Sequence, residues 1–299
     1  MNKPKIGLAL GSGGARGWAH IGVIRALEER GIVPDVVAGC SMGALVGAAY
    51  VGENLDALES WAMSITQRKM ATMIDVNLLS GGLIEGKQVR KFFESLDMPE
   101  MIEDQNIPFV AIATDMRTGR EIWLKDGPIV EAMRASIALP GIISPVRRVG
   151  CWLLDGGLTN PVPVSACRAL GADIIIAVNP EAKKYSVMWN EPAETGNETW
   201  ESIKKSLPLP IRAVFDAVSG RQDGARAPNY FDVVATSIDV MVDQVRRNRL
   251  IGDPPHVLLD VNLENFSILE FYNAKEAIAA GRACVGEASG ALEAMLKFA

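Results

Sequence analysis

The sequence predicts an α/β fold, in which helices cover both faces of a mostly parallel central sheet. Two observations predict it. Short apolar runs, typical of strands buried on both faces, alternate along the chain with longer segments of helical periodicity. Glycine or proline stands at several of the boundaries between them. Strands and helices in alternation imply parallel strands that are joined by helical crossovers.

The first half of the chain begins with the apolar run 6–10, which stops at Gly11 as a buried strand would. Residues 18–30 then carry apolar side chains at helical spacing, and Gly31 follows as a stop signal. The further elements expected before residue 140 show one of these two patterns: strand 35–38, helices 42–50 and 55–67, strands 109–114 and 121–124, and helix 129–138.

The second half of the chain continues the alternation. The segment 161–170 begins with prolines and stops at Gly171, which predicts a helix, and 173–178 is the clearest buried strand. The chain becomes more polar after that strand and has a loop-like stretch at 190–199. The other elements expected here are strand 151–154, helix 232–250, strand 256–261 and a closing helix at 273–296.

Nothing in the sequence marks a linker, so we expect one domain over residues 1–299. Residues 181–255 could form a lid or cap within this domain, or only a surface insertion. The sequence leaves both interpretations open.

The composition is that of an ordinary globular protein, with 48% hydrophobic and 22% charged residues. A formal net charge of −6 argues against a general affinity for nucleic acid, which needs clustered lysine and arginine. It also disfavours strong electrostatic docking to anionic membranes, while it leaves room for a local patch. The four cysteines and two histidines lack metal-ligand spacing, so we expect no metal site.

Two apolar segments bear on location. The run after the N-terminus is too short for a secretory signal. Residues 36–52 carry no charge, but they fall short of a full membrane span and contain four glycines, so a strand, a tight turn and a buried helix explain them better. We therefore expect a cytoplasmic protein that contacts the inner membrane face at most peripherally.

The segment Gly-Cys-Ser-Met-Gly at 39–43 matches the pattern G-x-S-x-G and lies between an apolar strand and a helix of small residues. In this setting Ser41 stands on a tight turn with its hydroxyl above the sheet. Gly39 and Gly43 are needed because larger side chains would clash with the neighbouring elements. A serine at a helix N-cap is the simpler interpretation, but the glycines and the context favour a nucleophile.

The segment Gly-Ser-Gly-Gly-Ala-Arg-Gly at 11–17 connects the first strand to the first helix and has three interpretations. A dinucleotide fingerprint is incomplete because Arg16 interrupts it, and a P-loop lacks its Gly-Lys-Ser/Thr. The third interpretation is an oxyanion hole of glycine N–H groups, in which Arg16 orients the loop or binds an anionic head group. The serine turn on the next strand favours this third interpretation.

Three residues compete for the role of general base. His20 and His256 are the two histidines, and neither has the surroundings of a triad histidine. Asp155, followed by Gly156 and Gly157, could accept the serine proton directly if burial raises its pKa. An ordinary Asp-Gly turn explains the same residues. The residues alone leave the base and the turn as open alternatives.

Taken together, these motifs resemble the patatin-like phospholipase family, in particular small bacterial members that are similar to the catalytic domain of neuropathy target esterase. The matching segments are Gly-Gly-Ala-Arg-Gly at 13–17, Gly-Cys-Ser-Met-Gly at 39–43, Ala-Ser-Ile-Ala-Leu-Pro-Gly at 135–141 with Pro145, and Asp-Gly-Gly at 155–157. The resemblance covers about residues 5–180.

The resemblance implies a three-layer α/β/α sandwich related to cytosolic phospholipase A2, with no metal or organic cofactor. It implies lipid acyl hydrolase or lysophospholipase activity through a dyad of Ser41 and Asp155 in place of a triad. The residues that it places around the dyad lie in the same motifs: Gly13, Gly14, Ala15, Arg16 and Met42 in the oxyanion hole, and Gly11, Gly17, Gly39, Gly43, Pro140, Gly156 and Gly157 in support of the site.

Two alternatives to lipid hydrolysis stay open. An acyltransferase would use the same dyad with an acceptor in place of water, and a regulatory lipid-binding protein would keep the fold with little turnover. The lipid substrate also makes transient membrane contact an expectation, whereas the oligomeric state is not predicted. A candidate membrane face is the segment 55–73, although its apolar side chains fit the core better: Trp61, Met63, Ile65, Met70 and Met73.

Overall fold

The computed structural model describes residues 3–67, 69, 82–84, 93, 96, 98–148, 150–182, 221–222, 225–226, 230–263, 266, 268 and 270–297. The loop expected at 190–199 and most of the segment 181–255 up to residue 220 lie outside these residues. Met70 and Met73 lie outside them as well.

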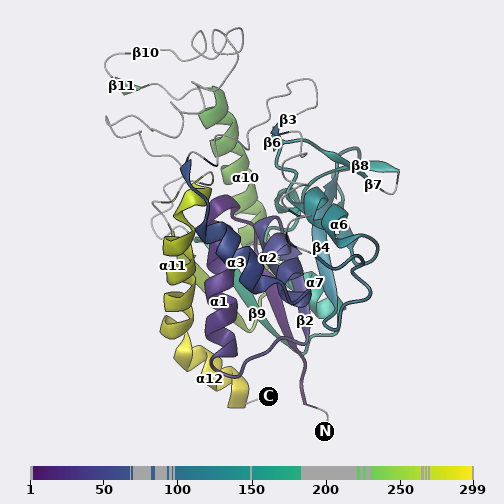
Figure 1. Ribbon diagram of the computed structural model, residues 1–299, viewed down its shortest axis with the longest axis vertical. Helices are drawn as coiled ribbons and strands as arrows, with labels where there is room; N and C mark the ends of the chain where they lie inside the picture. The colour runs from purple at the N-terminus through teal and green to yellow at the C-terminus, as the bar shows by residue number, and fades with distance from the viewer. Residues whose placement is uncertain are drawn as a thin grey trace.

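The described residues form an eight-stranded sheet in the order β12-β9-β1-β2-β4-β8-β7, with β5 paired to β4 (Figure 1). The five strands from β12 to β4 are parallel, and β5, β7 and β8 run antiparallel to their neighbours. The mostly parallel sheet predicted from the sequence is thus confirmed. The strands are β1 (Ile6–Leu10), β2 (Val36–Cys40), β4 (Phe109–Asp115), β5 (Glu121–Leu124), β7 (Val146–Arg148), β8 (Cys151–Asp155), β9 (Ile174–Ala182) and β12 (Val257–Asn262).

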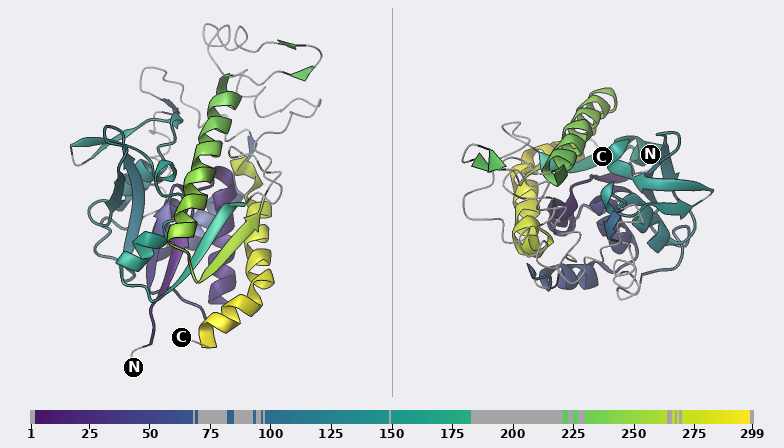
Figure 2. Two further views of the ribbon diagram at one scale, coloured as in Figure 1. Left: turned by 180° about the vertical axis from the view of Figure 1, so that it is seen from behind. Right: turned by 90° about the horizontal axis from the view of Figure 1, so that it is seen from above.

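Helices cover both faces of this sheet, which gives the three layers of an α/β/α sandwich (Figures 1 and 2). Two separate clusters of buried apolar residues show the two faces. The larger cluster includes Leu8 and Leu10 of β1, whereas Ala9 between them belongs to the smaller one, because successive side chains of a strand point to opposite faces. The helices are α1 (Ala19–Glu28), α2 (Met42–Val51), α3 (Leu55–Met63), α6 (Ile129–Ser136), α7 (Val164–Ala169), α10 (Tyr230–Gly252), α11 (Ala274–Glu287) and α12 (Ser289–Lys297).

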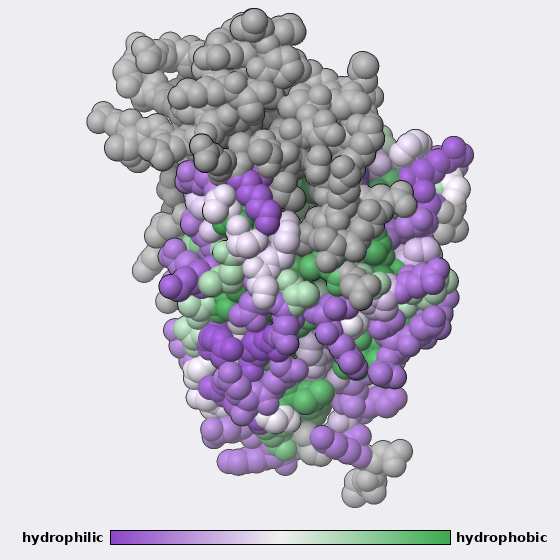
Figure 3. Space-filling model, viewed as in Figure 1, coloured by the Kyte–Doolittle hydropathy of each residue, from purple (hydrophilic) through white to green (hydrophobic). Residues whose placement is uncertain are grey.

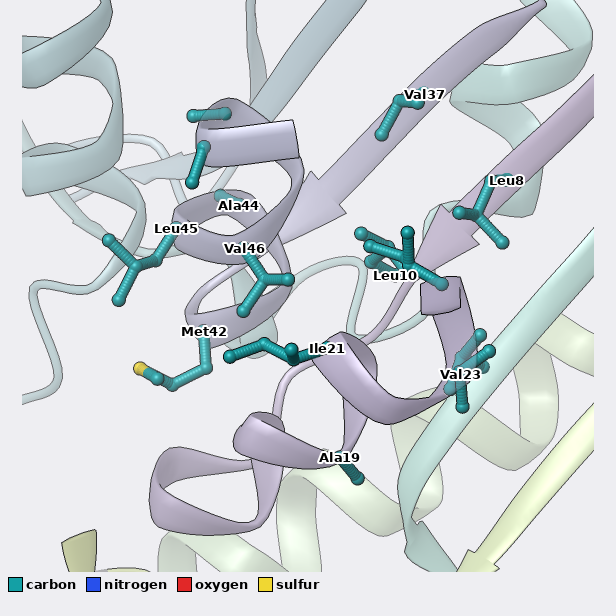
Figure 4. Packing of buried hydrophobic residues seen from close by; sticks show 14 of the residues in the cluster. Leu8, Leu10, Ala19, Ile21, Val23, Val37, Met42, Ala44, Leu45 and Val46 are labelled. Carbon is teal, nitrogen blue, oxygen red and sulfur yellow. The ribbon is translucent and has the colours of Figure 1, made fainter. Parts of the chain in front are cut away.

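The larger cluster lies between the sheet and the layer of α1, α2, α6 and α11, and Figure 4 shows the part of it at α1 and α2. Leu10 and Val37 point from the sheet toward Ile21 of α1 and Val46 of α2 in this view. The smaller cluster contains residues of α7 and has Leu250 of α10 packed against it, so these two helices cover the opposite face.

Helices α1 and α11 pack in unusually close contact through two glycines. A Cβ atom on Gly22 would lie 1.9 Å from the carbonyl oxygen of Ile278, and one on Gly281 would lie 2.1 Å from that of Ala19. A side chain at either position would force the helix backbones apart. Helix α11 is therefore fixed against the helix that follows the glycine loop.

Several element boundaries differ from the prediction for identifiable reasons. The helix expected at 161–170 begins at Val164, after Pro163, and the closing helix is divided at Ala288 into α11 and α12. Strand β9 continues past the expected end through Pro180, beside a register shift in its pairing with β12. Strand β7 was not expected, because its three residues are too short to show a period.

The face proposed for membrane contact at 55–73 is divided between core and surface. Ile65 is buried, and Trp61 is half-buried with its ring centroid 6.1 Å from that of Trp18. Met63 is half exposed, with 50% of its surface accessible. Within the described ranges, no helix is both long enough and apolar enough to cross a membrane.

Candidate active site

Ser41 lies on a strained turn between β2 and α2. Its φ of 54° and ψ of −123° place a non-glycine residue in a conformation that L-amino acids rarely adopt. The turn is possible because its neighbours have no side chains: a Cβ on Gly39 would lie 2.5 Å from the Cα of Ala44, and one on Gly43 would lie 2.2 Å from the carbonyl oxygen of Leu10. The turn therefore has the geometry of a nucleophile elbow.

Asp155 reaches Ser41 because β2 and β8 run toward each other along the same edge of β4. Ile112 of β4 pairs with Cys40 of β2 on one edge and with β5 on the other. The next residue, Ala113, pairs with β5 and with Asp155, so β8 must share the edge of β2. The residue that follows β2 and the residue that ends β8 consequently meet.

The two side chains form a direct hydrogen bond. The Ser41 hydroxyl donates to Oδ2 of Asp155 at 2.7 Å, and the N–H of Gly157 donates to Oδ1 at 2.7 Å. Asp155 is buried, and this burial raises its pKa to about 7, although the two hydrogen bonds act in the opposite direction. A carboxyl group with this pKa can accept a proton near neutral pH and later return it.

Ser136, a residue of the motif at 135–141 with no role predicted from the sequence, contacts the backbone of Ser41. The N–H of Ser41 donates to the Ser136 hydroxyl at 2.9 Å, and this hydroxyl donates to the carbonyl oxygen of Ile112 at 2.6 Å. Two residues further on, Ala138 accepts the N–H of Asp155 at 2.9 Å. The segment after α6 thus binds the backbone of both dyad residues.

A signal for Ser136 was present in the sequence. Ser136 carries a hydroxyl and lies in the motif at 135–141, on the buried face of a short helix. Its side chain is completely buried. A polar side chain in such a position needs a hydrogen-bond partner. The sequence did not show which partner it had.

The glycine loop lies beside the serine turn, because a Cβ on Gly17 would lie 2.3 Å from the Cβ of Met42. The loop continues into a 3-10 helix, η1 (Gly14–Trp18). Within the described part of the chain, the N–H groups of Gly13, Gly14 and Met42 meet no acceptor. These three amides are therefore available as hydrogen-bond donors.

The backbone amides of Ala15 and Arg16, which the resemblance places in the oxyanion hole, already have acceptors in the structure. The N–H of Ala15 donates to the carbonyl oxygen of Ile268 at 2.9 Å, and the N–H of Arg16 donates to that of Gly13 at 3.1 Å. The Arg16 side chain is buried and donates from Nε to the carbonyl oxygen of Phe266 at 2.8 Å. Arg16 therefore holds the loop in place.

The remaining motif residues permit close backbone contacts around the dyad. A Cβ on Gly11 would lie 2.7 Å from the carbonyl oxygen of Val178, and one on Gly156 would lie 2.3 Å from that of Ile112. Gly157 donates to Asp155, as described above. Pro140 is half-buried in the turn between α6 and the short strand β6 (Gly141–Ile143).

Neither histidine belongs to the dyad. His20 is fully buried in α1, and its Nε2 lies 2.8 Å from the carbonyl oxygen of Gly11, to which it donates. Burial lowers the pKa of His20 to about 4, so the ring is neutral at pH 7. His256 accepts the N–H of Ile175 on Nδ1 at 3.0 Å, in the sheet. Both histidines are structural.

A chain of polar side chains connects the glycine loop to α10. Ser12 donates to Oε2 of Glu181 at 3.3 Å. The buried Arg246 of α10 donates to the carbonyl oxygen of Glu181 at 3.0 Å and to Oδ1 of Asn179 at 3.1 Å, and it forms an ion pair with Asp243. The negative charge of Glu181 contributes to the raised pKa of Asp155.

Comparison with known proteins identifies the class of protein to which this fold and site belong. The family model described as patatin-like phospholipase matches residues 8–168, which is more than half of the 299-residue chain. The chain therefore belongs to the patatin-like phospholipase family. Membership in this family supports lipid acyl hydrolase activity in general.

Individual relatives extend the match. An NTE family protein of Mycobacterium tuberculosis is 33% identical over 339 aligned residues, which cover 98% of this chain and 93% of that protein. Human patatin-like phospholipase domain-containing protein 6 is 33% identical over 181 residues, which cover 58% of this chain and 13% of that protein. The solved structure of VipD from Legionella pneumophila matches 96% of this chain and 66% of its own, with a TM-score of 0.45 and 13% identity.

Proposed function

We propose that the protein is a serine acyl hydrolase that cleaves fatty-acyl esters of phospholipids or lysophospholipids. Its nucleophile is Ser41 and its general base is Asp155. The observation that carries the proposal is the 2.7 Å hydrogen bond from the hydroxyl of a strained serine to a buried carboxylate whose pKa is about 7. A cytoplasmic location with peripheral membrane contact remains part of this proposal.

The proposed reaction has two steps. Asp155 takes the proton of Ser41, and the serine oxygen attacks the acyl carbonyl, while the N–H groups of Gly13, Gly14 and Met42 hold the oxyanion. The alcohol leaves with the proton from Asp155, and an acyl-enzyme remains. Water then attacks this ester with Asp155 as base, and the fatty acid is released.

The test combines a covalent probe with hydrolysis of a short p-nitrophenyl ester and a lysophospholipid. We expect a fluorophosphonate to label the wild type and not Ser41→Ala, and both Ser41→Ala and Asp155→Asn to lose hydrolysis by at least about a thousandfold. Asp115→Asn is a matched control, because Asp115 is another buried carboxylate of the same sheet that accepts hydrogen bonds within its own turn.

Each contrary result has a definite meaning. Labelling and turnover by Ser41→Ala would disprove the assignment of the nucleophile. A folded wild type that labels but leaves every ester intact would favour the lipid-binding alternative. Products in which the acyl group has moved to an added alcohol, with no free fatty acid, would identify an acyltransferase that uses the same dyad.

A further inference from the structure

Two loops at one corner of the sheet carry a positive charge that contrasts with the acidic chain. Residues 116–120 and 146–152 together contain four arginines and no acidic residue, whereas the whole chain has a net charge of −6. Arg117, Arg120 and Arg147 are exposed. Arg148 is half-buried and donates to the carbonyl oxygen of Asp126. The local patch that the net charge left open is therefore present at this corner.

Large apolar side chains lie in the same place. Trp152 of β8 is directly opposite Arg147 of β7, and the N–H of Met116 donates to the carbonyl oxygen of Trp152. Directly opposite residues of antiparallel strands share a face, so Arg147 and Trp152 lie side by side, and Met116, the residue after β4, is hydrogen-bonded to the backbone of Trp152. Trp152 is 52% exposed and Met116 is 59% exposed. We call these three residues the corner row.

The corner row lies at the end of the sheet that carries the dyad. Trp152 is three residues before Asp155 on β8, which corresponds to about 10 Å along a strand. Strands β7 and β8 project to the side of the molecule, in the half away from the two termini (Figure 1). The same projection is coloured as hydrophilic to near-neutral in the space-filling view (Figure 3).

We propose that the corner row, with Arg117 and Arg120, docks the protein on the surface of an anionic phospholipid bilayer. Tryptophan prefers the interface between water and lipid, and arginines near an anionic surface are attracted to its headgroups. Docking at this corner presents the end of the sheet with Ser41 to the lipid. The biological role of this docking rests on the proposed function. Binding to the bilayer is measured separately, with a protein that does not hydrolyse lipid.

The experiment measures sedimentation of the Ser41→Ala protein with vesicles, so that no lipid is consumed. We expect binding to phosphatidylcholine vesicles that contain 30% phosphatidylglycerol, about tenfold weaker binding to pure phosphatidylcholine, and release at 1 M salt. Arg147→Glu and Trp152→Ser should each weaken binding by about fivefold or more. Ile251→Ser is the matched control: Ile251 is 81% exposed, but it lies at the end of α10 that precedes β12, at the opposite end of the sheet.

Activity provides a separate readout in the otherwise wild-type protein. Trp152→Ser should keep hydrolysis of a soluble p-nitrophenyl ester and lose hydrolysis of vesicle lipid. Equal vesicle binding by Arg147→Glu, Trp152→Ser and the parent protein would overturn the docking proposal, even if the dyad is correct. A dimer seen by light scattering and dissociated by the same substitutions would also overturn the docking proposal, because β7 would then be a contact between two copies of the chain. A wild type without esterase activity that still binds vesicles through this row would disprove only the proposed function.

Discussion

At the scale of single residues, the carboxyl group of Asp155 combines two opposing requirements. Burial raises its pKa to about 7, which suits a general base but makes the charged form costly in the folded protein. The hydrogen bonds from Ser41 and Gly157 reduce that cost without removing it. The buried carboxylate therefore lowers the stability of the folded protein while it provides a base that functions near neutral pH.

This environment predicts the pH dependence of activity. The base must be deprotonated to accept the proton of Ser41, so kcat/KM for a soluble ester should rise with pH and reach half of its maximum near pH 7. Initial rates between pH 5 and pH 9 measure it. A profile that is flat down to pH 5 would contradict the assignment of Asp155 as base.

The same pKa predicts the sign of a stability effect, which serves as the control. The folded protein holds the proton of Asp155 more tightly than the unfolded chain does. Ionisation of Asp155 therefore lowers the free energy of unfolding as pH rises from about 4 to about 7. Asp155→Asn cannot ionise, so its free energy of unfolding at pH 8 should exceed that of the wild type by roughly 2–4 kcal/mol. This difference should shrink toward pH 4. Thermal unfolding of both proteins over this range measures the difference.

At the scale of elements, the end of α6 sets the geometry of the dyad. Ser136 and Ala138 bind the backbone N–H groups of Ser41 and Asp155, which come from different strands. Because both contacts originate in one short segment, they fix the two strand ends relative to each other. This arrangement supports a strained turn whose own conformation would relax if the contact were lost.

Ser136→Ala tests this role. We expect kcat to fall by about fivefold to tenfold, equivalent to one lost hydrogen bond of about 1 kcal/mol, with little change in KM. The rate constant of fluorophosphonate labelling should fall in step, while the labelled fraction at the end point stays complete. A lower end point with an unchanged rate constant would indicate only partial unfolding. Ser165→Ala, which removes a hydrogen bond with Asn160, should keep the wild-type rate constant.

The comparison of prediction and structure is clearest for these elements. Periodicity and glycine positions were sufficient for β1, β2, α2 and the turn at Ser41, because each is determined by neighbours in the sequence. They could not show that β8 shares the edge of β2, since strand register is set by contacts between distant segments. For the same reason, the sequence could not predict the hydrogen-bond partner of Ser136 or the acceptors of the Ala15 and Arg16 amides.

At the scale of the whole molecule, α10 is attached to the site by buried polar groups. Arg246 and Asp243 are buried, and Arg246 also contacts Asn179 and Glu181 at the end of β9. Arg249, one turn further on, donates to Glu121 at 2.7 Å. This half of α10 is therefore held against the sheet by buried polar contacts.

Substitution of Arg246 measures that attachment. Arg246→Met leaves buried acceptors without their main donor, so we expect it to lower the free energy of unfolding by roughly 3 kcal/mol. Arg247→Met is the matched control on the same helix: it also pairs with Asp243, but its side chain is 49% exposed, and we expect a cost under about 1 kcal/mol. Urea unfolding of the two variants compares them. Equal costs would show that α10 is held by its apolar contacts instead.

The contacts of the glycine loop also determine when the site can become ordered during synthesis of the chain. Ser41 and Asp155 leave the ribosome long before Phe266 and Ile268, whose carbonyl oxygens hold Arg16 and Ala15 in place. Helix α11, which packs against α1, follows still later. A nascent chain with Ser41 and Asp155 already outside the ribosome therefore still lacks the two carbonyl oxygens that hold the glycine loop. Under the proposed function, the order of translation would then delay hydrolysis of lipid until the chain can fold as a whole.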